Sequence, residues 1–464
     1  MRVRVRRVDL ALTDCVTRLP FRFGIHTLTG APTLTARVEL ETDAGEAVGH
    51  SADLLVPRWF EKDPSKSLEQ DIEGLVASAT AAARLAEGTP PRTVFDLWWR
   101  LYGVRVHGTP EDAPDRLVRG FGVALVERAV MDATCRAAGL SFFEALRQDL
   151  FAVRAGEVHQ ALEGWSPADS LSGAPRERVA LRHTVGLVDA LTPDDIPERV
   201  DDGLPECLEE DIRAAGLRWF KLKLSGDPRA DLERCLRFTE VVEANAPDGW
   251  RLTVDGNEQF ADLGVLRTLL DELARDAGGA RLLERLQCIE QPLPRARSFE
   301  PAAVPGLAAL GEVAPVILDE ADHGIEAFPR ALALGYGGVS VKNCKGVLRA
   351  LLNRALCDRH RAFQSAEDLT NLGVLALQQD LTTVAALGLG HVERNGHHYF
   401  RGLGHLPAGE AQGALEAHPG LWREEAGTIA LRIEDGDLDL GSLQGVGYGY
   451  DCEIDFGARA PVER

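Results

Sequence analysis

Five short apolar segments in the middle of this chain each end in a charged residue, and this pattern restricts the possible folds more than any other feature. The segments are FKLK at 220–223, LTVD at 252–255, CIE at 288–290, VILD at 316–319 and VSVK at 339–342. Short apolar runs of this kind are typical of buried strands, where a charge is rare unless it is paired. The order Lys, Asp, Glu, Asp, Lys therefore predicts a metal site flanked by two bases.

The spacing of these segments predicts a parallel sheet. The charged ends are 23 to 35 residues apart, which leaves room for one crossover helix in each interval. Similar units follow at 361–368 and 388–395, and the first begins near residue 183. About eight such units close a TIM-type barrel, with an open doubly wound sheet as the alternative. The chain has neither a dinucleotide glycine fingerprint after an early strand nor a P-loop motif, which disfavours the open-sheet nucleotide folds.

The N-terminal third lacks the strand–helix repeat and has a different pattern of apolar residues. Alternating residues in the first 60 positions predict strands, with a hairpin turn at 43–45 and a loop at 20–32. Apolar spacing near 3.6 predicts helices at 68–88 and 120–140, the second ending at Gly139. The tail again reads as hairpin and loop, so we expect it to pack against the N-terminal region.

Composition excludes several classes of protein. The net charge of −21 over 464 residues argues against a nucleic-acid partner, because phosphate binding needs a basic face. The eight cysteines include no C-x-x-C pair, which favours free thiols and a reducing, cytoplasmic location. The basic N-terminus lacks the apolar core of a signal peptide, and no run of about 18 uncharged apolar residues is present to span a membrane.

The alternation of side chains along a strand predicts that the charged residues all point into the barrel. Alternate side chains share a face, so Phe220 and Leu222 point toward covering helices while Lys221 and Lys223 point into the barrel. The same count directs inward Thr253, Asp255, Asn257, Glu290, Asp319, Ser340 and Lys342. All these charges then lie at the C-terminal mouth of the strands, where barrel enzymes carry their catalytic groups.

The carboxylates of Asp255, Glu290 and Asp319 would repel one another inside a barrel unless a cation held them. Their donors are oxygen atoms only, which selects Mg²⁺, or Mn²⁺ as the second choice. Three protein ligands leave positions for water and for a substrate carboxylate. A cation placed in this way can stabilise the dianion that forms when the adjacent carbon loses its proton.

Lysines on the two outer strands supply the bases. An ordinary lysine is a poor base at neutral pH and needs nearby positive charge to become useful. We assign Lys223 as the principal base, Lys221 as its electrostatic neighbour and Lys342 as the acid or base on the opposite face of the substrate.

These motifs resemble those of the enolase superfamily, in the mandelate racemase/muconate lactonizing enzyme family and its subgroup of muconate lactonizing enzymes and dipeptide epimerases. The matching segments are FKLKLSGD, VDGN, IEQP, ILDE and VSVKNCKG. The resemblance implies an α/β fold in which a modified TIM (β/α)7β-type barrel carries an α+β capping domain. It places the capping domain at 1–150, completed by about 430–464, and the barrel at 151–429.

The resemblance also implies metal ligands at Asp255, Glu290 and Asp319. Glu320 is the alternative third ligand, and the face count favours Asp319.

The mandelate racemase branch places a catalytic histidine on the seventh strand. Here that strand carries Gln364 and Ser365, so the resemblance is to the branch with two lysines.

The predicted function is Mg²⁺-dependent removal of the proton α to a carboxylate. Racemisation or epimerisation needs both lysines, whereas dehydration and cycloisomerisation can proceed with one, and the sequence does not decide between them. Two alternatives remain open at this point. A barrel lysine could form a Schiff base as in an aldolase or lyase, or the chain could be a non-catalytic relative of the superfamily.

The predicted substrate is a small carboxylic acid, and we expect a homo-oligomer. Dipeptide epimerases resemble one another in an Asp-x-Asp on the eighth strand, whereas this chain has HVERNGHHYFRG, which argues against a dipeptide. Candidate substrate contacts come from the capping loops and the strand ends, although each of these side chains could equally have a packing role. They are Arg22, His26, Trp59, Asn257, Glu393, Asn395 and His397.

Overall fold

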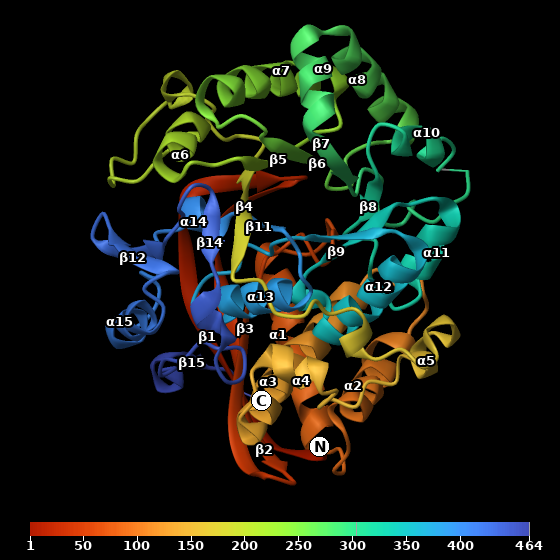
Figure 1. Cartoon of the computed structure of the whole chain (residues 1–464), viewed down its shortest axis with the longest axis vertical. Coiled ribbons are helices and arrows are strands. Elements are labelled where there is room, and N and C mark those ends of the chain that lie inside the picture. The colour runs from red at the N-terminus through yellow and green to blue at the C-terminus, as the bar shows by residue number, and fades with distance from the viewer. Residues whose placement is uncertain (303, 464) are drawn as a thin grey trace.

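A computed structural model describes residues 1–302 and 304–463, and Figure 1 shows an antiparallel sheet with helices beside it and a barrel of parallel strands. The antiparallel sheet has the strand order β15-β1-β2-β3. Its strands are β1 (Val3–Phe23), β2 (His26–Thr42), β3 (Gly45–Leu54) and β15 (Ala460–Pro461). Strands β2 and β3 meet at the predicted turn, where Thr42 pairs with Gly45.

The prediction of a loop at 20–32 is wrong. Strand β1 continues to its end at a tight turn around Gly24, where φ is +47°, and β2 begins directly after that turn. Phe21 and Phe23 are buried while Arg22 is exposed, so this segment has the alternation of a strand with one face on the core.

Helices of the N-terminal region cover one face of this sheet. They are α1 (Leu68–Glu87), α2 (Val94–Tyr102), α3 (Arg116–Ala138) and α4 (Phe142–Arg147), and the short α5 (Ala155–Val158) follows. A capping box at Ser67 starts α1, and Gly139 ends α3 in the left-handed conformation, as predicted. A Cβ atom on Gly49 of β3 would lie 2.3 Å from the Ala129 carbonyl oxygen, so glycine is required for the close packing of α3.

Eight parallel strands form the barrel, and it closes because β11 pairs with β4. They are β4 (Arg178–Val185), β5 (Trp219–Lys223), β6 (Arg251–Asp255), β7 (Leu286–Glu290), β8 (Val316–Leu318), β9 (Gly338–Val341), β10 (Phe363–Ala366) and β11 (His391–Arg394). Closure excludes the open doubly wound sheet and confirms the predicted TIM-type barrel.

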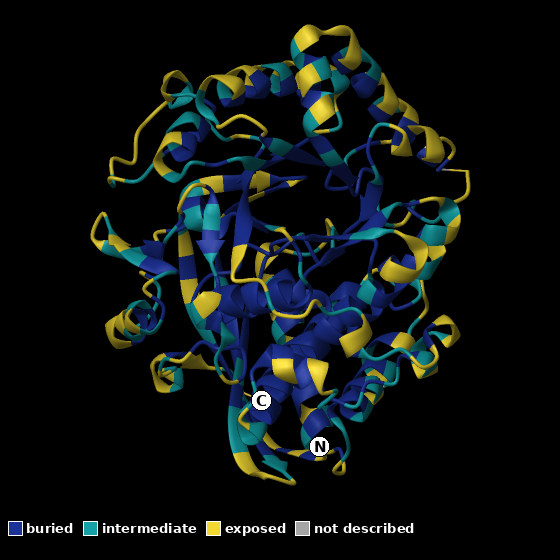
Figure 2. Cartoon of the chain, in the orientation of Figure 1, coloured by how far each residue is buried: buried dark blue, intermediate teal, exposed yellow. Residues whose placement is uncertain are grey.

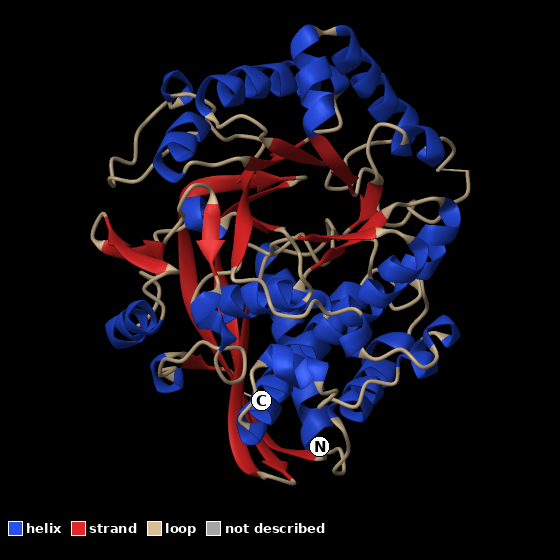
Figure 3. Ribbon diagram, viewed as in Figure 1, coloured by secondary structure: helices blue, strands red, loops and turns tan. Residues whose placement is uncertain are grey.

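Every one of the seven crossovers between these strands contains at least one helix, which gives the predicted (β/α)7β order (Figure 3). The crossover helices are α6 (Leu208–Ala215), α7 (Pro228–Asn245), α8 (Leu263–Arg275), α9 (Ala277–Arg285), α10 (Leu307–Gly311), α11 (Ala327–Leu334), α12 (Val347–His360) and α13 (Leu375–Ala386). After β11 come α14 (Gly396–Tyr399), α15 (Ala408–Ala417) and the hairpin of β12 (Trp422–Glu425) and β13 (Thr428–Leu431).

The barrel strands are buried, whereas the outer helices α7, α8 and α9 alternate between buried and exposed residues (Figure 2). The C-terminal tail contacts both parts of the molecule. Its strand β14 (Asp437–Asp439) pairs with β4, and β15 pairs with β1. Across the described residues, we find no helix with the length and apolar character needed to cross a membrane.

Candidate active site

The charged strand ends meet at the C-terminal end of the barrel, which we call the barrel mouth. Register explains the meeting, because Lys223, Asp255 and Glu290 are direct partners across β5, β6 and β7. Asp319 directly follows β8, and Lys342 directly follows β9. All five side chains are at least 94% buried.

Two lysine–carboxylate pairs stand at the two sides of this site. Lys223 Nζ lies 2.6 Å from Asp255 Oδ2, and Lys342 Nζ lies 2.7 Å from Asp319 Oδ2. Because β5 and β9 flank the three carboxylate-bearing strands, the two ammonium groups approach the site from different sides. Burial opposes the charge on Lys342, but the negative charges of Asp319, Glu290 and Glu393 together outweigh burial and raise the pKa of that lysine above its ordinary value.

Lys221 occupies the centre of a larger ion network below the mouth. Its Nζ lies 2.6 Å from Glu290 Oε2, 2.7 Å from Glu367 Oε2, 3.1 Å from Asp255 Oδ2 and 3.1 Å from Glu393 Oε2. Burial opposes its charge, and these carboxylates reverse that effect and raise the pKa of Lys221 well above its ordinary value. Lys221 is therefore a fixed positive charge beside Lys223, and the two share one oxygen of Asp255.

The carboxylates of the mouth have oxygen atoms left over for a cation. Glu290 Oε1, Glu320 Oε2 and Asn257 Oδ1 are buried and make no hydrogen bond. Burial, with the negative charges of Asp255 and Glu367, raises the pKa of Glu290 well above its ordinary value. A hard divalent cation would satisfy these oxygens and offset the repulsion, so the residues present fit Mg²⁺.

Asp319 and Glu320 are both fully buried, and their surroundings differ. Asp319 accepts from Ser340 and Lys342, and the positive charges of Lys342, Lys345 and Lys221 outweigh burial and hold its pKa below its usual range. Glu320 accepts from Asn257 Nδ2 at 3.2 Å, and burial with the nearby Asp319 raises its pKa to about 7. A metal ligand must be deprotonated, and strand alternation turns Asp319 inward, so Asp319 remains our choice of third metal ligand.

Two charged residues of the site, Lys345 and Glu367, were not predicted from the sequence. Lys345 Nζ lies 3.2 Å from Asp319 Oδ1 and 2.7 Å from Ser340 Oγ. Glu367, one residue beyond the end of β10, pairs with both Lys221 and Arg182. The strand period contained the signal for Glu367, because it lies two positions after Ser365, which also faces the interior and accepts from Arg182.

A loop of the N-terminal region covers the mouth. The ring of Trp59 is buried, and its centroid lies 4.3 Å from Lys342 Nζ. Arg295 donates to the backbone carbonyls of Trp59 and Phe60 at 2.8 and 2.7 Å, and Lys62 donates to the Asn257 carbonyl at 3.0 Å. Of the predicted capping contacts, the structure thus brings Trp59 directly to a proposed catalytic lysine.

The other predicted capping contacts lie on the first hairpin. His26 is buried against Phe23 with its Nε2 unpaired, and burial lowers the pKa of the imidazole below its ordinary value. Arg22 is exposed, and its carbonyl accepts from Leu187.

The three candidates on and directly after the eighth barrel strand, β11, lie in different surroundings. Glu393 faces the interior, where it accepts from Lys221 and from Thr184 Oγ1. Asn395 is buried with Oδ1 unpaired. His397 is not brought to the mouth, because α14 turns its side chain toward His183, whose Nδ1 lies 3.1 Å from His397 Nε2.

Solved structures of low sequence identity share this whole architecture. An enolase from Bradyrhizobium complexed with magnesium and mandelic acid has a TM-score of 0.62 at 17% identity and covers 100% of this chain and 99% of its own. Muconate lactonizing enzyme from Pseudomonas fluorescens, complexed with muconolactone, has a TM-score of 0.63 at 16% identity and covers 98% and 97%. The chain has the enolase-superfamily fold. The predicted resemblance is thereby confirmed at the level of the fold.

A curated relative of this enolase-fold chain adds sequence similarity. The L-Lys-D/L-Arg epimerase of Methylococcus capsulatus is 29% identical over 201 residues, which cover 39% of this chain and 52% of the relative. The match thus spans about half the length of the relative. No family model matches the chain.

Proposed function

We propose that this enolase-fold chain is an enzyme that removes the proton α to a substrate carboxylate and returns it to the opposite face, giving racemisation or epimerisation. The supporting observation is the pair of buried lysines, Lys223 and Lys342, that approach the carboxylates of the mouth from two sides. One lysine removes the proton and the other donates it, and the roles exchange for the other isomer.

The cofactor we propose is Mg²⁺, held by Asp255, Glu290 and Asp319. When bound, it would hold the substrate carboxylate and stabilise the negative charge that develops as the α-proton leaves. Magnesium also accompanies two structural neighbours, the Bradyrhizobium enolase and an enolase from alpha proteobacterium bal199.

The arrangement of the lysines disfavours the Schiff-base alternative. A Schiff base uses a single lysine, whereas Lys223 and Lys342 each pair with a carboxylate, on two sides of the site. The complete set of three carboxylates and two flanking lysines also argues against a non-catalytic relative, because burying so many charges without a use is costly.

The substrate we propose is a small carboxylic acid with a hydrogen on its α-carbon. Trp59 and the loop around it enclose the mouth, and its apolar ring suits a compact ligand. The name of the curated relative adds one specific candidate, the dipeptide of lysine and arginine, despite the missing Asp-x-Asp on the eighth strand.

The decisive experiment measures hydrogen exchange in D₂O. The purified protein with Mg²⁺ is incubated with each isomer of N-acyl amino acids, hydroxy acids, acid sugars and Lys-Arg dipeptides, and α-deuterium is followed by mass. We expect Lys223→Ala to lose exchange with one isomer and Lys342→Ala with the other, each by about 10²- to 10⁴-fold. Lys66→Ala, a partly exposed lysine paired with Glu61, is the matched control.

The pattern of losses distinguishes the reactions. Loss in only one lysine variant would point to dehydration or cycloisomerisation, which the likeness to muconate lactonizing enzyme makes the second candidate. Unchanged exchange in both variants would overturn the proposal.

A further inference from the structure

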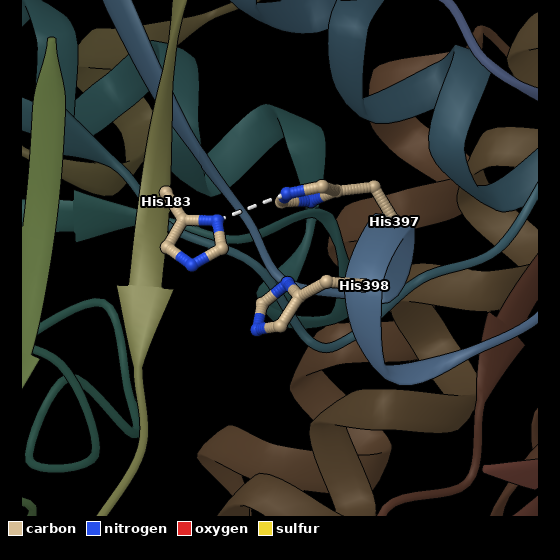
Figure 4. A group of neighbouring side chains, drawn as sticks. All are labelled: His183, His397 and His398. Carbon is tan, nitrogen blue, oxygen red and sulfur yellow. Dashed lines mark hydrogen bonds between the residues drawn. The ribbon is translucent and has the colours of Figure 1, made fainter. Parts of the chain in front are cut away.

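Three histidines gather on the outer side of the barrel wall, away from the barrel mouth. His183 comes from β4, and His397 and His398 come from α14, as Figure 4 shows. Each offers a ring nitrogen, and these three nitrogens all lie within 4.8 Å of one another. We call these residues the histidine cluster.

Strand alternation separates the histidine cluster from the catalytic groups. The neighbours of His183 on β4, Arg182 and Thr184, turn inward and bind Ser365 and Glu393 inside the barrel. His183 therefore points outward, toward the helices. The cluster and the mouth are two sites separated by the barrel wall.

We propose that the histidine cluster binds a divalent transition metal, with Zn²⁺ the preferred ion, as a structural site. Three imidazole nitrogens are the donors that Zn²⁺, rather than Mg²⁺, selects. The ligand atoms thus differ between the two sites: the histidine cluster offers nitrogen, whereas the metal ligands proposed at the mouth are all carboxylate oxygens.

The orientation of His183 supports this site. Its Nδ1 faces His397 Nε2 at 3.1 Å, close to the spacing of about 3.3 Å that two nitrogens have on one tetrahedral zinc. Its other nitrogen, Nε2, lies 3.7 Å from Asp211 Oδ2. A carboxylate behind the second nitrogen is the usual support of a metal-bound histidine, because it orients the ring and raises its basicity.

His398 supplies the third nitrogen. Its side chain is about 94% buried, yet neither ring nitrogen makes a hydrogen bond of normal geometry, and His397 Nδ1 is likewise unpaired. Burial lowers the pKa of all three imidazoles, that of His183 to about 3, so they are neutral with a free lone pair at physiological pH. Buried unpaired nitrogens are costly unless a ligand uses them.

Space for the metal and a further ligand adjoins the rings. A cavity of about 220 Å³ is lined by His183, His398 and Asp211, and a smaller one of about 50 Å³ by His397, His398 and Asp211. A water molecule occupies about 30 Å³, so either cavity can provide the fourth ligand. The nitrogen atoms lie within 4.8 Å of one another, so the widest separation must shorten by up to about 1.5 Å to reach the spacing on one zinc, which rotation of the rings can supply.

A metal at this position would link the first and the last strand of the barrel, at the point where the barrel closes. His183 lies on the first barrel strand, and His397 and His398 follow the last one, 214 residues away in sequence. Asp211 adds α6 to the same point. Bound metal would stabilise this closure, because a ligand that binds only the folded state raises its stability.

Cobalt provides the test, because four-coordinate Co²⁺ with nitrogen ligands absorbs visible light strongly and octahedral oxygen sites do not. The full chain is freed of metal with a chelator, supplied with excess Mg²⁺ to fill the mouth, and titrated with Co²⁺ and then Zn²⁺. We expect one strongly absorbing cobalt per chain, displaced by zinc, and a melting temperature that rises with zinc. His360→Gln, an exposed histidine on α12, is the matched control and should bind normally.

His183→Gln and His397→Gln should each abolish the absorbing cobalt and the thermal shift, while Asp211→Asn should weaken binding about 10- to 100-fold. Circular dichroism checks each variant, and if His183→Gln fails to fold, the less buried His397→Gln carries the test. Absence of strong absorption in the wild type, or its persistence in a folded histidine variant, would overturn the proposal. Neither readout depends on the catalytic activity.

Discussion

The barrel mouth and the histidine cluster lie on the two sides of one barrel wall, and they bury polar groups in opposite ways. At the mouth, the ammonium groups of Lys223 and Lys342 pair with the carboxylates of Asp255 and Asp319 at 2.6 and 2.7 Å. In the cluster, burial keeps three imidazoles neutral, with a single hydrogen bond among them. The mouth offers oxygen donors and proton-transfer groups, whereas the cluster offers only nitrogen lone pairs.

This difference shows what each site can do. Buried charges cost several kcal/mol unless they are paired, so a network of five or more belongs where chemistry needs it. Neutral imidazoles are cheaper to bury and suit a softer metal that holds chain segments together. The proposed catalytic site is thus the charged one of the two, and the proposed structural site is the neutral one.

The largest effect is expected from replacing Lys221, the central lysine of the charged network at the mouth. Lys221→Met leaves four buried carboxylates without their shared cation, and we expect a loss of about 3–5 kcal/mol in the free energy of unfolding together with the loss of exchange activity. Urea denaturation measures the first effect. Lys66→Met, whose ion pair is partly exposed, should cost less than about 1 kcal/mol. Equal effects of the two substitutions would contradict a central role for Lys221.

The next largest effect is expected from Mg²⁺, which should stabilise the protein through the mouth and not through the histidine cluster. Adding Mg²⁺ to the metal-free protein at about 100 times its dissociation constant should raise the free energy of unfolding by about 2.7 kcal/mol. Glu290→Gln should remove most of this gain, because it replaces a buried carboxylate that has a free oxygen by a neutral amide. His397→Gln should leave the gain intact. A gain that depends on the histidine instead would reverse our assignment of the two metals.

The third prediction concerns Glu367, which the sequence analysis missed. Glu367→Gln weakens its charge-assisted bonds to Lys221 and Arg182, and we expect a loss of about 1.5–3 kcal/mol in stability by urea denaturation. Glu434→Gln removes an exposed pair with Arg432 and serves as the control, with an effect below about 1 kcal/mol. A neutral outcome for Glu367→Gln would show that the network tolerates losing this carboxylate charge.

The smallest expected effect near neutral pH is the pH response of His50, a half-buried histidine that belongs to neither site. Burial, with help from Arg136, lowers the pKa of His50 to about 3, so the unfolded chain binds the proton first as pH falls below about 6.5. Stability should therefore decrease from pH 6.5 toward pH 3, by on the order of 1 kcal/mol per pH unit from this residue. His50→Asn should flatten that slope, and the exposed His360→Asn should not. Parallel pH profiles for wild type and His50→Asn would refute the assignment.

Local sequence was enough to predict about eight parallel β/α units and the direction of their charges, whereas the pairing of β11 with β4 decided for the barrel over the open sheet. The strand period of two and the intervals between charged ends are properties of short segments, and they placed Lys223, Asp255 and Glu290 on one face without knowledge of the fold. The alternation at Phe21 and Phe23 was equally local, but the prediction placed a loop there.

The side-chain contacts of the two sites could not be predicted from sequence, because they join segments that are distant along the chain. Asp319 pairs with Lys342, directly after β9, and with Lys345 three residues further on, and the Trp59 ring contacts Lys342 from a loop of the N-terminal region. His397 was expected at the mouth because it follows β11, but the short α14 directs its side chain outward.

What the sequence determined by itself is the order of strands and the kind of group at each strand end, because both follow from hydrophobic periodicity along the chain. What only the tertiary structure decided is which groups share a charge, which nitrogen atoms stay unpaired and which loop closes the mouth. Those properties depend on distances between side chains, and barrel closure brings His183 and His397 to 3.1 Å across 214 residues. No periodic pattern along the chain encodes such a distance.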